Sequence, residues 1–402
     1  MRIVVPVGLA IGCLWVAGCD APVDHFPPNR VHALVVSASR QVDAELAAED
    51  SLSVIDAWFG TPEQPRWPKD LLRGDAAQHL VDPDRLVRAA GRVYSDQENH
   101  HFGLYNEHCV TCHGVAGGGN GPASLLQNPY PRDFRAGVFK WKSTARSSKP
   151  TREDLLRILQ HGAPGTAMPS FQTVAGEDLE ALIDYVIFLS VRGEVERRLV
   201  DIAVDELGYE ERRPDADASL LGVVSEAPQA ADTDAADLAV AELNEVAGSW
   251  AEAPEEVVPV PDETPFDAAS IERGRELFHG PIANCVGCHG PDGDGQAATL
   301  DYDDWTKEYT TRLAITPDDD DAVRPYRQAG ALRPRQIHPR RLTSGVFRGG
   351  GDSQTLYRRL LVGIAGTPMP GVIVAQEPSA TGLTAEQIWD LVHYIVSLSE
   401  QP

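Results

Sequence analysis

The chain has 402 residues, more than one ordinary hydrophobic core requires, so two domains with additional segments are expected. Its apolar content is ordinary for a globular protein. A formal net charge of −25 argues against nucleic-acid binding, which needs a basic face.

The first residues are typical of an export signal. A positively charged start is followed by the apolar run Ile3–Val16 and by small residues, which predicts a signal peptide over residues 1–18. The run is too short for a transmembrane helix, which needs about 20 apolar residues. Val-Ala-Gly before Cys19 is similar to a bacterial lipobox, in which Cys19 is lipidated. The alternative is a plain signal peptide with a chance cysteine.

Residues 19–90 contain no recognisable chemistry and several prolines. We interpret them as a tether and strap packed on the first domain, with a possible helix within Leu34–Trp58. Residues 206–267, by contrast, are strongly acidic and predict an extended linker. Ala236–Trp250 has apolar residues at helical spacing, so a short docked helix is an equal alternative there.

Residues 91–205 and 268–402 are two copies of one sequence pattern. Four blocks recur in the same order, so we expect two tandem domains. The blocks are Cys109-Val-Thr-Cys-His with Cys285-Val-Gly-Cys-His, Pro131–Lys140 with Pro339–Arg348, Gly162–Pro169 with Gly363–Pro370, and Ala181–Ser190 with Asp390–Ser399. The second copy is longer between its histidine and methionine blocks: 80 positions separate His289 from Met369, against 55 from His113 to Met168. The additional residues lie around 299–338.

The C-x-x-C-H spacing is the attachment signature of c-type haem. In an exported protein an even number of cysteines first suggests disulfides, and zinc or a redox pair is a further alternative. A histidine directly after each pair, in two matching repeats, favours haem instead. The predicted thioether ligands are Cys109, Cys112, Cys285 and Cys288, and the predicted axial histidines are His113 and His289.

Each repeat also offers a second axial ligand. Apart from Met1, the only methionines are Met168 and Met369, and both stand in the frame Gly-Thr-x-Met-Pro. We predict that both sulfur atoms bind iron. Other histidines do not correspond between the repeats and are expected to be surface or core residues: His100, His101, His108, His161, His279, His338 and His393.

Amphipathic helices are predicted over Glu177–Ser190 and Gln387–Ser399. Thr384 and Gln387 form a capping-box pattern at the start of the second. A helix is also expected before each haem motif, ending near Tyr105 in the first copy and near Phe278 in the second.

With these features the chain resembles the class I cytochrome c family over about residues 95–195 and 268–402. The resemblance implies an all-α fold in each domain, with N- and C-terminal helices that cross at a glycine–aromatic contact, and two covalently bound haem c groups. Two departures are visible: His101 stands where the first domain would place the crossing glycine, and the aromatic residue precedes the haem motif by different distances in the two copies.

Electron transfer is the expected function, because an iron with histidine and methionine ligands has no position open to substrate. A dihaem peroxidase is the alternative enzyme, and it would need one haem that can open. Lipid-anchored dihaem cytochromes of this kind resemble proteins that serve terminal oxidases, quinol-oxidising complexes or periplasmic dehydrogenases. We therefore expect redox protein partners at the periplasmic face of a membrane, and Asp20 suggests the inner one.

A basic segment interrupts the acidic chain. Residues 131–152 carry seven cations against Asp133 alone. One interpretation is that some of these residues, mainly Arg132, neutralise haem propionates, and another is that the acidic linker, residues 210–267, folds over the segment. The remainder is predicted to surround an exposed haem edge and to steer an acidic redox partner.

Overall fold

The computed structural model describes residues 25–210, 212–215, 219–224, 234–296 and 299–399. The predicted signal peptide and Cys19 lie outside the described residues. The described chain is mostly helical, with two ribbons of two short antiparallel strands, which confirms the all-α class. No helix in this part of the chain is both long and apolar enough to cross a bilayer.

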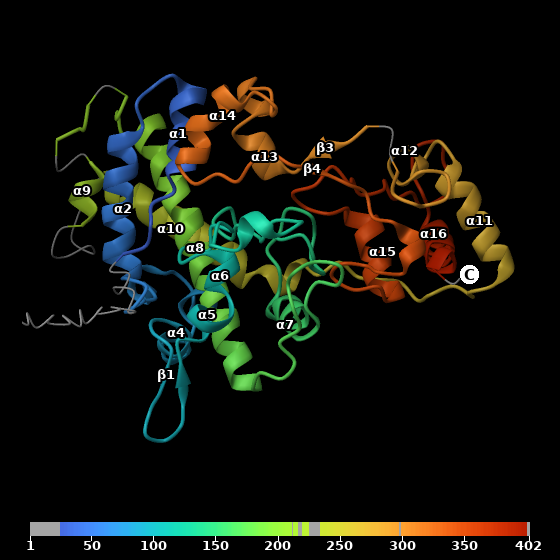
Figure 1. Ribbon diagram of the computed structural model, residues 1–402, viewed down its shortest axis with the longest axis horizontal. Helices are drawn as coiled ribbons and strands as arrows, with labels where there is room; N and C mark the ends of the chain where they lie inside the picture. Colours follow the sequence, from blue (N-terminus) through green and yellow to red (C-terminus); the bar gives the residue numbers. More distant parts are fainter. Residues whose placement is uncertain (1–24, 211, 216–218, 225–233, 297–298, 400–402) are drawn as a thin grey trace, which may run out of the picture.

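Two lobes lie side by side (Figure 1). The first contains α1 Arg30–Arg40, α2 Glu45–Phe59, η1 Lys69–Leu71, α3 Asp75–Gln78, α4 Pro83–Ala89, β1 Tyr94–Ser95, β2 His101–Phe102, α5 Leu104–His108, α6 Val110–His113, η2 Ser124–Leu126, α7 Arg152–His161, α8 Gly176–Asp205, α9 Leu220–Val223, α10 Asp234–Ala251 and η4 Ala253–Glu256. The later segments are α11 Ala268–His279, α12 Val286–His289, β3 Asp301–Tyr302, α13 Asp304–Glu308, η5 Thr311–Leu313, α14 Asp320–Gln328, β4 Gln336–Ile337, η6 Leu342–Ser344, α15 Ser353–Val362 and α16 Ala385–Ser399.

Helix α8 organises the first lobe. It is 30 residues long, well beyond the helix predicted over 177–190, because apolar residues continue along it and are buried as far as Val204. Helices α2, α4 and α10 all pack on α8. The residues before and after the first repeat therefore share one hydrophobic core with it. The acidic segment contains helix α10, and its end is bonded to the first lobe through a bridge between Thr144 and Val257.

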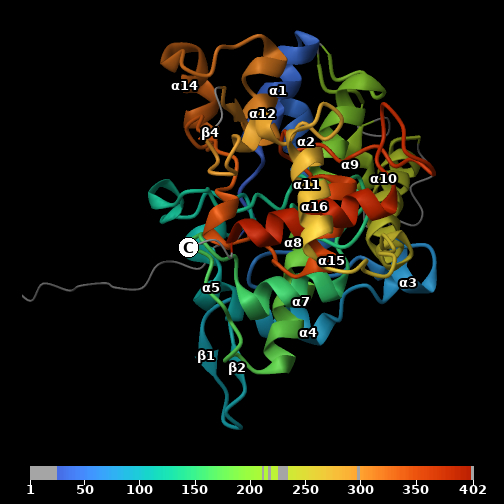
Figure 2. The same ribbon diagram turned by 90° about the vertical axis from the view of Figure 1, so that its right-hand side faces the viewer.

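In the second lobe, α11 crosses α16, as the turned view shows (Figure 2). Gly274 lies at the crossing, where a Cβ atom would stand 1.9 Å from the carbonyl oxygen of Asp390. One turn along, the rings of Phe278 and Tyr394 meet at 5.2 Å. The expected glycine–aromatic crossing is thus present here. The capping box predicted at the start of α16 is confirmed by reciprocal hydrogen bonds between Thr384 and Gln387.

The first lobe lacks this crossing. The prediction of a helix that ends near Tyr105 is wrong: the β1–β2 ribbon approaches the motif instead, and α5 only begins at Leu104. Gly103 makes the turn into α5 with a φ of 78°, close against the backbone of Arg92. Helix α4 takes the packing position on α8. Of the glycine–aromatic contact only the aromatic pair is present, with the ring centroids of Tyr105 and Tyr185 4.8 Å apart.

The additional residues of the second repeat return to the first lobe. Helices α13 and α14 lie beside α1 (Figure 1), and Tyr309, Val323 and Tyr326 pack there against the α1 face that carries Val31 and Val35. The ion pair of Arg197 on α8 with Glu308 on α13 closes the same contact. The two lobes are therefore joined by a long insert as well as by the linker.

Gly274→Ala should destabilise the second lobe. The Cβ atom would meet backbone at the α11–α16 crossing, and overpacking of this kind costs about 1–3 kcal/mol. Thermal unfolding of the haem-loaded chain would measure the loss. Gly248→Ala on α10 is the matched control, because nothing lies within 4 Å of its Cβ position. That change should be neutral or stabilising, since alanine favours helix over glycine by about 1 kcal/mol. Equal effects of the two changes would contradict the close packing inferred at Gly274.

Candidate haem sites

Each C-x-x-C-H motif forms one short helical turn. Helices α6 and α12 begin just after Cys109 and Cys285, and each ends at its histidine before a glycine with positive φ. All four cysteines in these turns are free thiols. Because Cys and His share one turn, two sulfur atoms and one imidazole are presented from a single rigid segment, as covalent haem attachment requires.

The Pro-Arg blocks orient the histidines. Nδ1 of His113 lies 2.9 Å from the carbonyl oxygen of Arg132, and Nδ1 of His289 lies 3.0 Å from that of Arg340. An Nδ1–H donated to a carbonyl fixes the tautomer and leaves Nε2 for a metal. Burial lowers the pKa of His113 to about 4 and also lowers the pKa of His289, although the hydrogen bond to the carbonyl opposes this shift in both. Both imidazoles are therefore neutral, the form that binds iron.

The methionine loops have identical internal bonding. The amide of Met168 donates to the hydroxyl of Thr166, and the carbonyl of Met168 accepts from Ala163. The amide of Met369 donates to Thr367 in the same way, and its carbonyl accepts from Ile364. This pattern gives the Gly-Thr-x-Met-Pro frame its physical meaning, because the threonine positions the methionine backbone.

Gly162 shows why this frame begins with glycine. It has a φ of 66°, and a Cβ atom would stand 2.6 Å from the backbone of Pro169. The end of α7 can therefore turn back against the methionine only without a side chain.

The other histidines take part in different contacts. His101 and Glu107 are 2.5 Å apart, and His161 and His279 each face the carbonyl four residues earlier in the chain. His393 is buried on α16, where it meets Ser270 and Glu263. Within the described residues, no group of three or more metal-binding side chains forms a separate metal site. These observations favour the methionines, and their ligation remains a prediction.

The two sites face each other across the lobes. The guanidinium of Arg132 lies 3.7 Å from the ring centroid of Trp305, at the start of the insert. The same ring packs on Gly366 of the second methionine loop, where a Cβ atom would be only 2.3 Å away. In the opposite direction, Nη2 of Arg340 lies 3.1 Å from the Cβ position of Gly165 in the first methionine loop. Arg340 therefore reaches the first methionine loop directly, and Arg132 is connected to the second through Trp305.

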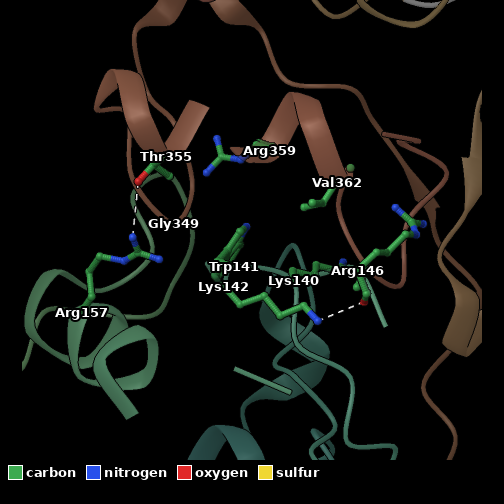
Figure 3. A pocket seen from close by; sticks show the side chains of 11 residues that line it. Lys140, Trp141, Lys142, Arg146, Arg157, Gly349, Thr355, Arg359 and Val362 are labelled. Carbon is green, nitrogen blue, oxygen red and sulfur yellow. Dashed lines mark hydrogen bonds between the residues drawn. The ribbon is translucent and has the colours of Figure 1, made fainter. Parts of the chain in front are cut away.

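A cavity between the lobes collects positive charge (Figure 3). Five cations and no acidic residue line it: Lys140, Lys142, Arg146, Arg157 and Arg359. Burial is the largest of the causes that bring the pKa of Lys140 down to about 7 and that of Arg359 to about 10, and neighbouring cations contribute to both shifts. Arg157 is paired with Asp154, and Lys142, Arg146 and Arg359 are hydrogen-bonded to backbone carbonyls. The cluster still holds more positive than negative charge, which suits an anionic partner.

Haem supplies such a partner, because every haem carries two propionate carboxylates. Nε of Arg340, Nε of Arg348 and Nε1 of Trp305 are also buried and have no hydrogen-bond acceptor among the described residues, and the Trp305 ring lies 5.6 Å from Nζ of Lys140. The residues present therefore fit the group: Lys140 and Arg359 would hold propionates, and Cys109, Cys112, Cys285 and Cys288 would form the thioethers. The haem supplies the redox chemistry, and the chain supplies its ligands and counter-charges.

The predicted docking patch over residues 131–152 is wrong. Arg135 and Lys149 are buried and paired with Asp133 and Glu194. The other cations also have partners within the molecule. Arg132 stacks on Trp305, and Arg152 forms ion pairs with Glu180 and Asp184. Lys142 donates to backbone carbonyls, and Lys140 and Arg146 line the cavity between the lobes. These side chains are bonded within the molecule, some inside the first lobe and some at its boundary with the second, so they do not form a free basic patch. Sequence analysis did not identify Trp305 as a site residue. The repeated Pro-Arg block was the available signal, because its recurrence in both copies indicated a role common to Arg132 and Arg340.

Comparisons with known families find a cytochrome c domain in each repeat. Residues 98–186 match the family model described as cytochrome c oxidase, cbb3-type, subunit III, and residues 271–399 match the model described as cytochrome c. No curated protein matches the chain significantly. A solved structure, the reducing HAO-like protein complex of Kuenenia stuttgartiensis, aligns with 22% identity over 76% of this chain and 99% of its own, at a TM-score of 0.45. The two domains each imply one covalently bound haem c.

Met168→Ala and Met369→Ala should each remove about half of the far-red sulfur–iron charge-transfer band of the oxidised protein. Each change should also lower the reduction potential of its own haem, because methionine ligation raises that potential. Optical spectra with redox titration would measure both effects. Replacement of the exposed His161 by Ala is the control and should leave the band intact. A band that survives both methionine changes would place the ligands elsewhere.

Proposed function

We propose that this chain, a dihaem cytochrome of the class I cytochrome c family, carries electrons by passing them between its own two haems and from one redox protein to another. Its two cytochrome c domains imply electron transfer. The observation that carries the finer proposal is that each Pro-Arg block is connected to the opposite methionine loop, directly through Arg340 and by way of Trp305 from Arg132. Ligand-bearing segments that touch across the lobe boundary favour direct exchange of electrons within one molecule.

Two closed iron sites support a carrier rather than an enzyme. Both methionine loops have the same internal hydrogen bonds, so the two irons are expected to have matching histidine and methionine ligands. A dihaem peroxidase would need one site that differs enough to open. Rapid reaction of the oxidised protein with peroxide would favour that alternative.

The bridge through Trp305 supports a route between the sites. The carbonyl of Arg132 accepts from the first haem's histidine, while its side chain lies on Trp305. The tryptophan in turn packs on Gly366, three residues before Met369. A continuous path of bonded and packed groups thus joins His113 of the first site to the Met369 loop of the second.

For the partners, we propose a respiratory donor complex or dehydrogenase on one side and a terminal oxidase on the other. The model matched by the first domain is named for a subunit of a cbb3-type cytochrome c oxidase, which supports an oxidase as acceptor. We further propose that Cys19 carries a lipid that holds the protein on the periplasmic face of the inner membrane, as its lipobox suggests.

Electron exchange between the haems should be intramolecular. After a pulse that delivers less than one electron per molecule, the absorbance should relax at a rate independent of protein concentration. Met369→Ala lowers the second potential and should leave the electron mainly on the first haem at equilibrium, and Met168→Ala should have the reverse effect. A relaxation rate proportional to protein concentration would show that electrons move only between molecules.

Cys19→Ser should release the protein from membranes with both haems retained. Stable attachment needs more than one acyl chain, and a lipidated N-terminal cysteine would supply them. Fractionation of cells followed by haem staining would measure the distribution. Cys13→Ser, within the predicted signal, is the matched control and should leave the protein in the membrane fraction. Unmodified protein found fully soluble would contradict the anchor but not the cytochrome function.

A further inference from the structure

Arg146 of the first lobe holds the methionine loop of the second. Its Nη1 donates to the carbonyl oxygen of Met369 and its Nη2 to that of Thr367, both at 2.8 Å. The guanidinium passes where Gly363 has no side chain, since a Cβ atom there would be 2.6 Å from Nη1. Figure 3 shows Arg146 at the edge of the cavity between the lobes. The planar fork of arginine suits two parallel bonds of this kind.

The backbone that carries Arg146 is itself fixed. The ammonium of Lys142 donates to the carbonyl of Ala145 at 2.7 Å and to that of Arg146 at 3.0 Å. The amide of Ala145 donates to the backbone carbonyl of Glu256, so the segment is also bonded to the stretch of chain that leads to α11. Arg146 therefore extends from a supported turn although its own side chain is exposed.

The first methionine loop has no equivalent pair of donors among the described residues. From the second lobe it receives one bond, from Arg348 to the carbonyl of Gly165, at the long distance of 3.4 Å. The internal bonds of the two loops are the same, so this difference arises entirely from the neighbouring lobe. Two loops of nearly identical sequence are thereby held to different degrees.

We propose that Arg146 is a positioning residue for the second haem, which holds the Met369 loop closed and makes the second iron–sulfur bond harder to displace than the first. The inference rests on the proposed ligation by Met369. Methionine is a neutral ligand, and an external ligand can replace it only when its loop moves away. Hydrogen bonds from a charged group to two carbonyls of that loop oppose this movement.

Cyanide is the probe for loop opening. In a Met168→Ala chain the remaining charge-transfer band belongs to Met369 alone, so loss of this band with added cyanide reports the second site. With Arg146→Gln added, the cyanide concentration at which half of the band is lost should fall by about tenfold. This factor corresponds to about 1.4 kcal/mol. Arg146→Lys keeps the charge without the fork and should give an intermediate shift. In a chain that keeps both methionines, the cyanide titration should have two phases. Arg146→Gln should shift only the phase at higher cyanide concentration, which belongs to Met369.

Arg157→Gln is the matched control. Arg157 also bonds across the lobes, from Nη1 to the hydroxyl of Thr355 at 3.3 Å, but it has no hydrogen bond to the methionine loop. Its replacement should leave the midpoint within about twofold, which is less than 0.5 kcal/mol. An unchanged midpoint with Arg146→Gln, or equal shifts with both glutamines, would overturn the inference. Absence of the band in Met168→Ala itself would instead refute ligation by Met369.

Discussion

The hydrogen bond from each haem-motif histidine to the carbonyl of its Pro-Arg arginine is the interaction on which the rest of the structure depends. It orients the imidazole, and it fixes the backbone of Arg132 or Arg340 at the boundary between the lobes. The same residue thus supports a ligand with its main chain and contacts the other lobe with its side chain. Ligand geometry and domain packing are linked, because neither can shift without the other.

Positive charge is also concentrated at the boundary between the lobes. The chain is acidic overall, yet cations from both lobes line the cavity where the lobes meet. Like charges held close together repel, so an anionic group bound there would reduce this repulsion. Haem propionates held by Lys140 and Arg359 would therefore favour contact between the lobes.

Local patterns predicted most of the sites. The C-x-x-C-H turns, the repeated methionine frame and the capping box of α16 depend on residues close in sequence, and periodicity identified the helices on either side. The crossing helix of the first lobe failed, because a ribbon and α4 replace it through contacts with α8 that no local pattern contains. The docking patch failed for a related reason. Charge density alone does not reveal that these side chains are bonded within the molecule, and Trp305 reaches Arg132 from more than 170 positions away.

The packing of α13 and α14 on α1 also sets an order of events in biogenesis. The chain is synthesised from its N-terminus, so the face of α1 that carries Val31 and Val35 stays uncovered until Tyr309 and Tyr326 have been made. A truncated product would keep that apolar face exposed to chaperones and proteases. The insert therefore covers this face of the first lobe only after α11, α12 and α14 of the later chain have been made, and before α15 and α16.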